Sequence, residues 1–348
     1  MFKLIEKLEK EHILSKEELV ALIDQHNNTE ISNFLFKKAR EVKEYYYGKD
    51  IFIRGLIEFT NYCKNDCYYC GICSSNKNVA RYRLTKDEIL SCCELGYDLG
   101  FRTFVLQGGE DPWFNDERMV DIVSSIKIKY PDCALTLSLG ERSYESYKLL
   151  KDAGADRYLL RHETANPEHY SCLHPQKMSS EHRKECLLDL KSLGYQFGTG
   201  FMVGSPYQTI ENLAEDLIFI YDIQPQMVGI GPFIPHHETR FANFSGGTVE
   251  LTIFLISILR LILPTSLLPS TTALGSIDEF GREKAILAGA NVVMPNLSPT
   301  QVREKYMIYD NKVGTEDDAL TSLENIKRKI ESTGNKVVVS RGDAKTTN

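Results

Sequence analysis

The sequence has no apolar segment long enough to cross a bilayer, and it has no excess of positive charge. Its longest apolar run, residues 251–264, is interrupted by Arg260 and predicts a buried helix. The net charge of −7 disfavours broad binding to nucleic acid or to a membrane surface, because both need a basic face. Residues 1–19 are charged and amphipathic, without the apolar run of a signal peptide. We therefore expect a cytoplasmic protein with no nucleic-acid partner and no membrane partner.

Cysteine is scarce, and most of the chain does without it. There are nine cysteines in 348 residues, and none follows Cys186. Four of the nine lie close together, at Cys63, Cys67, Cys70 and Cys73. Nine cysteines in a reducing cytosol do not suggest a disulfide framework, so the tight group indicates a metal site.

The spacing of these cysteines distinguishes between two kinds of metal site. Zinc sites usually use two C-x2-C pairs separated by a longer stretch, so that four thiolates form a tetrahedron. Here the pattern is C-x3-C-x2-C, with Cys73 just beyond it, and no second pair follows at zinc-finger distance. A run of thiolates this short is more typical of an iron–sulfur cluster. The spacing therefore favours an iron–sulfur cluster, with a structural zinc site as the alternative.

Short apolar segments alternate with helical ones from residue 51 onward. Before them, residues 1–50 have helical patterns, including one that begins after Ser15, a residue type that caps helix N termini. The apolar segments are separated by helical stretches that end in or near glycine, and they lie at residues 51–60, 102–109, 134–140, 157–164, 197–204, 227–235, 269–275 and 291–296. This series predicts an α/β fold, a closed (β/α)8 TIM-type barrel over residues 51–348. An N-terminal helical extension over 1–50 precedes it, and a closing helix follows residue 312. A doubly wound open sheet is the alternative.

Polar residues and glycines follow several of the predicted strands. In a barrel of this kind the chemistry takes place at the C-terminal ends of the strands. Three arginines on inward-facing positions would make a positive cavity, which suits an anionic substrate held by guanidinium groups. The predicted substrate cavity comprises Arg54, Gln107, Thr136, Arg157, Arg161, Thr271, Thr272, Met294, Tyr306 and Tyr309.

The cysteine loop, with Tyr69 before its third cysteine, resembles that of the radical S-adenosylmethionine (SAM) superfamily. In that family three cysteines bind three irons of a 4Fe–4S cluster, and the fourth iron is left open for the amino and carboxylate groups of SAM. Reductive cleavage of SAM then yields a 5′-deoxyadenosyl radical. The resemblance implies that Cys63, Cys67 and Cys70 bind one 4Fe–4S cluster. It also implies that Cys73 is not a ligand, because a fourth thiolate would block SAM.

The same resemblance implies a set of SAM-binding residues. The glycines of QGGED (107–111) would receive the SAM amino group with their backbone, since glycine permits close approach. Glu163 would bind the ribose or amino group, Ser138 the ribose, and Arg183 the carboxylate. For Arg183 a solvated position on a helix is the alternative. The full predicted set is Tyr69 (against adenine), Gly108, Gly109, Glu110, Ser138, Glu163, Arg183 and Met227.

Within the superfamily, four segments indicate a particular group: RYLLRHETANP (157–167), MVGIGPFIPH (227–236), TTALG (271–275) and GANVVMPNLSP (289–299). They are similar to the HydE-type maturases of FeFe hydrogenases, a group that also contains biotin synthase and methylornithine synthase. The resemblance implies a role in assembling the diiron site of the hydrogenase. Its implied substrate is an anionic iron–carbonyl–cyanide–cysteine complex, and its implied partners are an external electron donor and other maturation proteins.

The sequence departs from some of these relatives in its cysteines. Some members of the group carry a second cluster near the C terminus, and we expect none here because no cysteine follows Cys186. Biotin synthase has cysteines on interior strands, and their lack in residues 136–140 and 198–204 disfavours sulfur insertion. Two other functions stay open, a lysine mutase like methylornithine synthase and a non-catalytic iron–sulfur scaffold or carrier.

Overall fold

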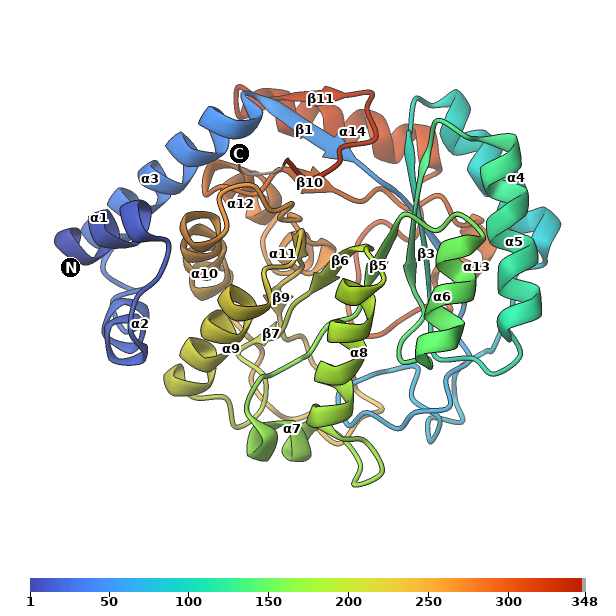
Figure 1. Cartoon of the computed structure of the whole chain (residues 1–348), viewed down its shortest axis with the longest axis horizontal. Helices are drawn as coiled ribbons and strands as arrows, with labels where there is room; N and C mark the ends of the chain where they lie inside the picture. The colour runs from blue at the N-terminus through green and yellow to red at the C-terminus, as the bar shows by residue number, and fades with distance from the viewer. Residues whose placement is uncertain (346–348) are drawn as a thin grey trace.

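Parallel strands form the centre of the molecule, with helices packed outside them (Figure 1). This computed structural model describes residues 1–345. The strands are β1 (Asp50–Ile53), β2 (Gly55–Thr60), β3 (Thr103–Gly108), β4 (Ala134–Ser138), β5 (Arg157–Leu159), β6 (Gln196–Thr199), β7 (Met202–Val203), β8 (Met227–Val228), β9 (Gly231–Pro232), β10 (Val292–Val293) and β11 (Lys336–Val338).

The helices alternate with these strands along most of the chain. They are α1 (Phe2–Glu11), α2 (Lys16–Ile23), α3 (Thr29–Tyr47), α4 (Lys86–Asp98), α5 (Asp116–Lys129), α6 (Tyr144–Asp152), α7 (Pro167–Leu173), α8 (Ser180–Ser192), α9 (Ile210–Ile223), α10 (Val249–Ile262), α11 (Thr272–Ile277), α12 (Gly281–Leu287), α13 (Thr300–Arg303) and α14 (Ala319–Ser332). The predicted cap at Ser15 is confirmed, since its side chain accepts from the Glu18 amide in a capping box. The predicted buried helix over 251–264 is α10.

The strand pairings trace a ring. Strands pair in the order β2-β3-β4-β5-β6-β8, and β10 pairs with β1, which continues into β2 after Arg54. Two isolated bridges join the ends of this series, Met227 with Leu267 and Pro269 with Val292. The backbone thus closes through residues 267–269, in agreement with the predicted barrel.

Three of the predicted strands differ in detail. The segment 269–275 is not a strand, because the chain turns into helix α11 at Thr272 and Pro269 has no amide hydrogen for a ladder. The segments 197–204 and 227–235 are each split, into β6 and β7 and into β8 and β9. The split lies where Gly200 meets the facing chain, since a Cβ there would be 1.9 Å from the Gly229 carbonyl oxygen.

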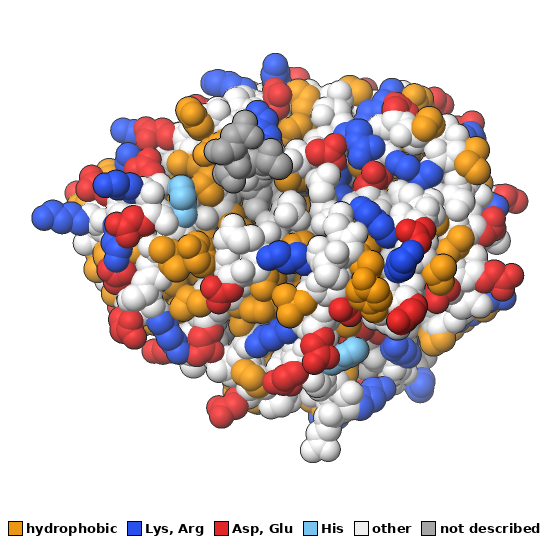
Figure 2. Space-filling model, viewed as in Figure 1, with side chains coloured by type: hydrophobic (Ala, Val, Ile, Leu, Met, Phe, Trp, Pro, Cys, Tyr) orange, Lys and Arg blue, Asp and Glu red, His pale blue; other side chains and the backbone are white. Residues whose placement is uncertain are grey.

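The N-terminal helices lie on one side of the barrel, and the C-terminal segment crosses its base. Buried side chains of α1, α2 and α3 form one apolar cluster with those of α9, α10 and α12. The predicted closing helix is α14, and after it β11 pairs with β1, a strand that sequence reasoning missed. Within residues 1–345, no helix is both long enough and apolar enough to cross a membrane. Figure 2 shows acidic and basic side chains interspersed over the face viewed there.

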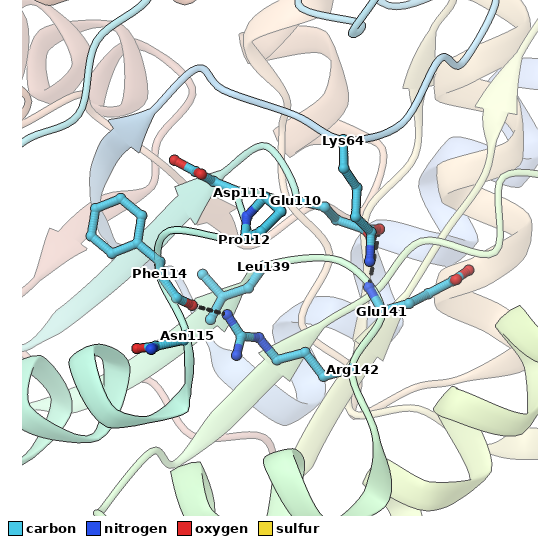
Figure 3. Close-up of a pocket in the computed structure, with 9 residues that line it drawn as sticks. All are labelled: Lys64, Glu110, Asp111, Pro112, Phe114, Asn115, Leu139, Glu141 and Arg142. Carbon is cyan, nitrogen blue, oxygen red and sulfur yellow. Dashed lines mark hydrogen bonds and ion pairs between the residues drawn. The ribbon is translucent and has the colours of Figure 1, made fainter.

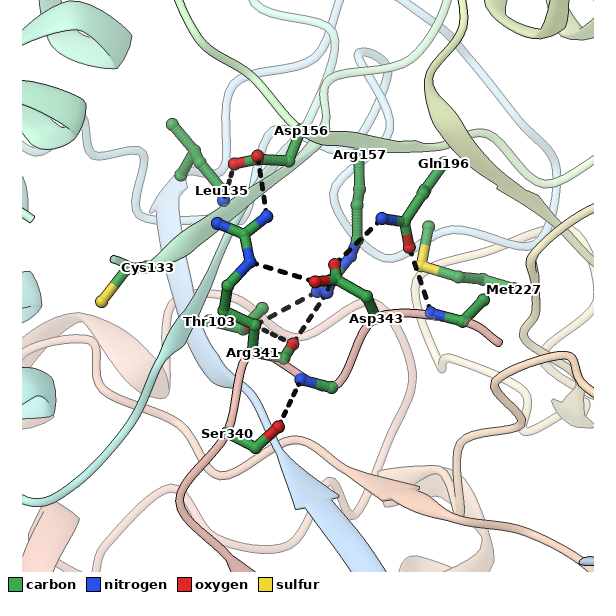
Figure 4. A network of polar contacts seen from close by, with 12 residues as sticks. Thr103, Cys133, Leu135, Asp156, Arg157, Gln196, Met227, Ser340, Arg341 and Asp343 are labelled. Carbon is green, nitrogen blue, oxygen red and sulfur yellow. Dashed lines mark hydrogen bonds and ion pairs between the residues drawn. The ribbon is translucent and has the colours of Figure 1, made fainter. Parts of the chain in front are cut away.

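Residues 341–343 hold Arg157 at the base of the barrel (Figure 4). Arg157 is fully buried at the first position of β5, and it donates to the Asp343 carboxylate at 2.6 Å and to the Arg341 carbonyl at 2.7 Å. Its other guanidinium contact is Thr103, the first residue of β3. The prediction that Arg157 lines the rim cavity therefore needs correction, because its charge is bound by the C-terminal segment at the opposite end.

Candidate active site

The cysteine loop, residues 61–80, is organised by one arginine. The guanidinium of Arg81 donates to four main-chain carbonyl groups of the loop, those of Asn61 (2.5 Å), Ile72 (2.8 Å), Cys73 (2.6 Å) and Asn76 (3.0 Å). Such a planar fork fixes the loop more firmly than a flexible ammonium would. Sequence reasoning missed Arg81, since no motif marks it.

The loop gives its cysteines unequal surroundings. Cys63, Cys67 and Cys70 are half-buried, whereas Cys73 is buried and its sulfur lies 3.5 Å from the Ser75 hydroxyl. Burial, together with the Cys70 and Cys63 thiols nearby, raises the pKa of Cys67, and burial also raises the pKa of Cys63. A metal that binds these thiols must therefore displace their protons.

The glycines after β3 allow the cysteine loop to approach the barrel. A Cβ on Gly109 would lie 2.2 Å from the Tyr62 carbonyl oxygen and 2.8 Å from the Cys63 Cβ. A Cβ on Gly108 would meet Thr60 at 2.7 Å. The cysteine loop thus requires Gly109, and the side chains of β2 require Gly108, in addition to the predicted contact with SAM.

Glu110 joins the cysteine loop to the segment that follows β4 (Figure 3). Its Oε1 accepts from the Glu141 amide at 3.1 Å, and its Oε2 lies 3.3 Å from the Lys64 ammonium. Together with Arg142 these residues line a small surface cavity of about 170 Å³. The structure therefore gives the Glu110 side chain a bridging position between loops.

Charged groups gather at the ends of β4 and β5. Glu163 is buried with φ of 66°, a left-handed conformation that is rare for residues other than glycine and that recurs at functional sites. Its Oε2 lies 3.2 Å from Arg161 without a well-oriented hydrogen bond. Arg183 is buried in α8 and donates to the Glu141 carboxylate at 2.6 Å and to the Arg161 carbonyl at 3.0 Å. Arg183 is therefore not a solvated helix residue, and its partner Glu141 was missed by sequence reasoning.

The remaining residues predicted to bind SAM lie at different depths. Tyr69 reaches His174, with 3.2 Å between its hydroxyl and Nε2, so that His174 fixes the ring. Ser138 ends β4 opposite Gln107 of β3, as predicted for the rim. Met227 lies deeper, where its sulfur accepts from Arg54 at 3.0 Å. The contact with Arg54 associates Met227 with the predicted substrate cavity.

Inside the barrel, several polar atoms are buried without partners. Within residues 1–345, no hydrogen bond satisfies Nε of Arg54, Oγ1 of Thr136, Oγ1 of Thr271 or Nε of Arg161. Buried polar atoms without hydrogen bonds lower the stability of the fold unless a ligand or a water molecule bonds to them. All four residues belong to the set predicted to line the substrate cavity.

The residues after β10 cover part of the cavity. Gln107 donates to the Tyr306 hydroxyl at 3.4 Å, and burial raises the pKa of Tyr309 to about 12. Behind Tyr306, the buried pair of Glu58 and Lys312 lies 2.5 Å apart, another contact that sequence reasoning missed. Thr272 and Met294 border a neighbouring cavity on the side of the barrel.

Two loop histidines contact the segment after Tyr309. His236, His237 and Asp310 bring ring nitrogens and a carboxylate within 4.8 Å of one another. The Glu238 amide donates to Nδ1 of His236, which places the ring proton on Nε2, facing Asp310. With a proton on Nε2 and a hydrogen bond on Nδ1, the neutral His236 ring has no free nitrogen to offer a metal. The two histidines and Asp310 therefore join two loops by hydrogen bonds.

Comparison with known proteins decides which family has this site. Residues 57–220 match the Radical SAM superfamily. The [FeFe] hydrogenase maturase subunit HydE of Thermotoga maritima is 43% identical over 96% of this chain and 94% of its own length. The chain belongs to the radical SAM superfamily. A radical SAM protein of this HydE type is also similar to 3-methylornithine synthase of Methanosarcina acetivorans, at 30% identity over 90% of this chain and 88% of that protein.

Solved structures support the same fold. Methylornithine synthase (PylB) has a TM-score of 0.85 with 27% identity, and the match covers 96% of this chain and 97% of that one. HydG, a maturase of the [FeFe]-hydrogenase, has a TM-score of 0.82 with 22% identity, covering 97% of this chain and 75% of that one. The similarity to HydG concerns the fold alone.

The residues present fit the 4Fe–4S cluster and SAM that the radical SAM family uses. Three neighbouring thiols are suitable donors for iron, and they lie on a loop at the C-terminal end of β2. Buried atoms of Glu163 and Arg161, which pair with each other but have no hydrogen-bond partner among residues 1–345, provide an acceptor and donors for a polar ligand. The donor set and the unsatisfied groups thus agree with the cofactors that the family implies.

Proposed function

We propose that this radical SAM enzyme acts in the maturation of FeFe hydrogenase, on a small anionic organometallic substrate related to an iron–carbonyl–cyanide–cysteine complex. The observation that carries the proposal is the 43% identity to HydE over nearly the whole length of both chains. The three-thiol loop at the strand ends supports it, since it supplies the ligands that the chemistry requires.

Each group of residues has a separate task in this proposal. Cys63, Cys67 and Cys70 hold the cluster, and when bound the cluster and SAM supply a carbon-centred radical. Glu163 offers a carboxylate to the SAM ribose or amino group, and Arg183, oriented by Glu141, offers its charge to the carboxylate. The unsatisfied donors of Arg54, Arg161, Thr136 and Thr271 bind the anionic substrate deeper in the barrel.

The proposal extends to the surroundings of the enzyme. We propose one 4Fe–4S cluster, because the sequence has no cysteine after Cys186 from which to build another. The enzyme would act in the cytosol and receive electrons from an external donor. It would exchange intermediates with other hydrogenase maturation proteins and use no nucleic acid or membrane partner.

Two measurements test this function in order. Anaerobically reconstituted protein with SAM and dithionite should release 5′-deoxyadenosine, whereas a scaffold or carrier would release none. The protein should then restore hydrogenase activity in a maturation mixture that lacks its HydE component. Release of 5′-deoxyadenosine without any restoration would contradict the maturase function while leaving the radical SAM activity intact.

A lysine mutase is the second candidate, because the 3-methylornithine synthases are 30% identical and PylB has the same fold. It predicts that L-lysine raises the yield of 5′-deoxyadenosine and is converted to an isomer. Turnover of lysine together with no effect on maturation would replace our proposal with this one.

A further inference from the structure

The side cavity, of about 460 Å³, is bordered by Leu56 of β2 and by residues 294–296, directly after β10. It is enclosed by α11, α12, α14 and residues 312–317. None of the predicted SAM-binding residues lines it, and it shares only Thr272 and Met294 with the predicted substrate cavity. Its volume is sufficient for a small organic molecule.

Arg282 is a half-buried charged residue of this cavity without an ion pair among the residues that the structure describes. Its Nη2 donates to the Thr272 hydroxyl at 3.3 Å, but its buried Nε has no partner within residues 1–345. It forms no ion pair with any residue that the structure describes, and burial lowers its pKa. A half-buried guanidinium without an ion pair lowers the stability of the fold unless a counter-ion binds it.

The other charged residues of the lining do not serve Arg282. Lys312 is held by the Glu58 carboxylate at 2.5 Å, and Lys329 lies 3.6 Å from Glu283. Glu279, Asp317 and Arg328 also line the cavity, but all three are exposed, so that water screens their charges. The buried part of the cavity is therefore positive.

Apolar groups complete the lining around this charge. Leu56, Met294 and Ile326 face the same cavity as Arg282. Ser276 and Asn296 add hydrogen-bonding groups beside them. A guanidinium among apolar walls and a few polar groups matches an organic carboxylate with a short apolar body.

We propose that this side cavity binds a small organic carboxylate, with its carboxylate on Arg282 and its apolar part against Met294 and Ile326. The site is separate from the radical SAM centre and does not depend on the function proposed above.

The test is a titration of the reconstituted holoprotein with 4-fluorobenzoate, followed by the 19F line width under anaerobic conditions without reductant. 4-Fluorobenzamide, which has the same shape and no charge, is the control ligand. We expect saturable binding of the acid and none of the amide. Arg282→Gln should weaken binding about tenfold or more, because a charge-assisted hydrogen-bonded pair is lost. Arg282→Lys should retain part of the affinity.

Two further variants separate this site from the barrel interior and from a loss of folding. Arg161→Gln removes an interior guanidinium and should leave binding unchanged. Ser322→Trp places a large side chain in the lining of the cavity and should abolish binding, whereas Ser322→Ala should not. Each variant is checked for iron content and melting temperature. Equal affinity in wild type and Arg282→Gln, loss of binding in Arg161→Gln, or no binding by wild type would overturn the proposal.

Discussion

Gly109 and Cys63 are in such close contact that a Cβ on the glycine would lie 2.8 Å from the Cβ of the cysteine and 2.2 Å from the Tyr62 carbonyl oxygen. Gly109→Ala should therefore displace the cysteine loop, because backbone atoms cannot move aside as a flexible side chain can. We expect the iron content after reconstitution to fall well below that of the wild type. Gly229→Ala is the matched control, since its Cβ would meet nothing closer than 3.7 Å. Equal iron content in the two variants would show that the loop tolerates the shift.

The cysteine loop makes Cys73 the decisive control for the ligand set. Cys73→Ala should keep the iron content, the visible absorption of the cluster and the cleavage of SAM, because Cys73 is buried beside Ser75. Cys67→Ala should lose all of these. Comparable losses in both variants would require a four-cysteine ligand set and would contradict the open iron that SAM needs.

Arg81 should control how firmly the cluster is held. Arg81→Gln removes donors to the carbonyl groups of Ile72, Cys73 and Asn76, and we expect the cluster to be lost faster to a chelator. Arg81→Lys restores the charge but not the fork, so it should rescue only part of the effect. The rate of bleaching near the cluster absorption band measures this directly. A full rescue by lysine would assign the effect to charge alone.

The fold was largely predictable because its signals are local, whereas the parts that were mispredicted depend on contacts between distant segments. The cap at Ser15 and the apolar run of α10 are visible in a few consecutive residues. Nothing near Arg157 reveals that Asp343 pairs with it. The strand β11 did carry a signal, the β-branched run 337–339, which the prediction of a closing helix passed over.

In the candidate site, too, the features with local sequence signals were predicted and the contacts between distant segments were not. The spacing of the four cysteines indicated an iron–sulfur cluster, and the resemblance to the radical SAM superfamily predicted Cys63, Cys67 and Cys70 as its ligands. The partner of Arg183 could not be found in this way, since Glu141 is distant in sequence and meets it only after the barrel forms. Likewise, the charge of Arg54 was visible, but its contact with Met227 was not.

The contact between Asp343 and Arg157 should give the protein a pH-dependent stability. Partial burial raises the pKa of the Asp343 carboxyl, but Arg157 and Arg341 outweigh this and lower it below its ordinary value. A lowered pKa stabilises the fold above the unfolded value of about 3.9, and this contribution is lost as the pH falls through the folded value. The stability difference between wild type and Asp343→Asn should be constant from about pH 8 to 5 and shrink below about pH 4. Urea unfolding at several pH values measures it, and a difference that grows with acidity would contradict the pairing.

Removing one member of the buried pair of Glu58 and Lys312 should lower the unfolding free energy much more than replacing both members with uncharged residues. Lys312→Met leaves the Glu58 carboxylate, only 1% exposed, without its cation, and the expected loss in unfolding free energy is about 3–5 kcal/mol. Glu58→Gln combined with Lys312→Met removes both charges, and the amide oxygen of the new side chain would still accept from the Asn296 amide that now donates to Glu58. The double variant should therefore recover most of the loss. Urea unfolding of both variants gives the comparison, and equal losses would mean that Lys312 acts mainly through its contact with the Tyr306 carbonyl.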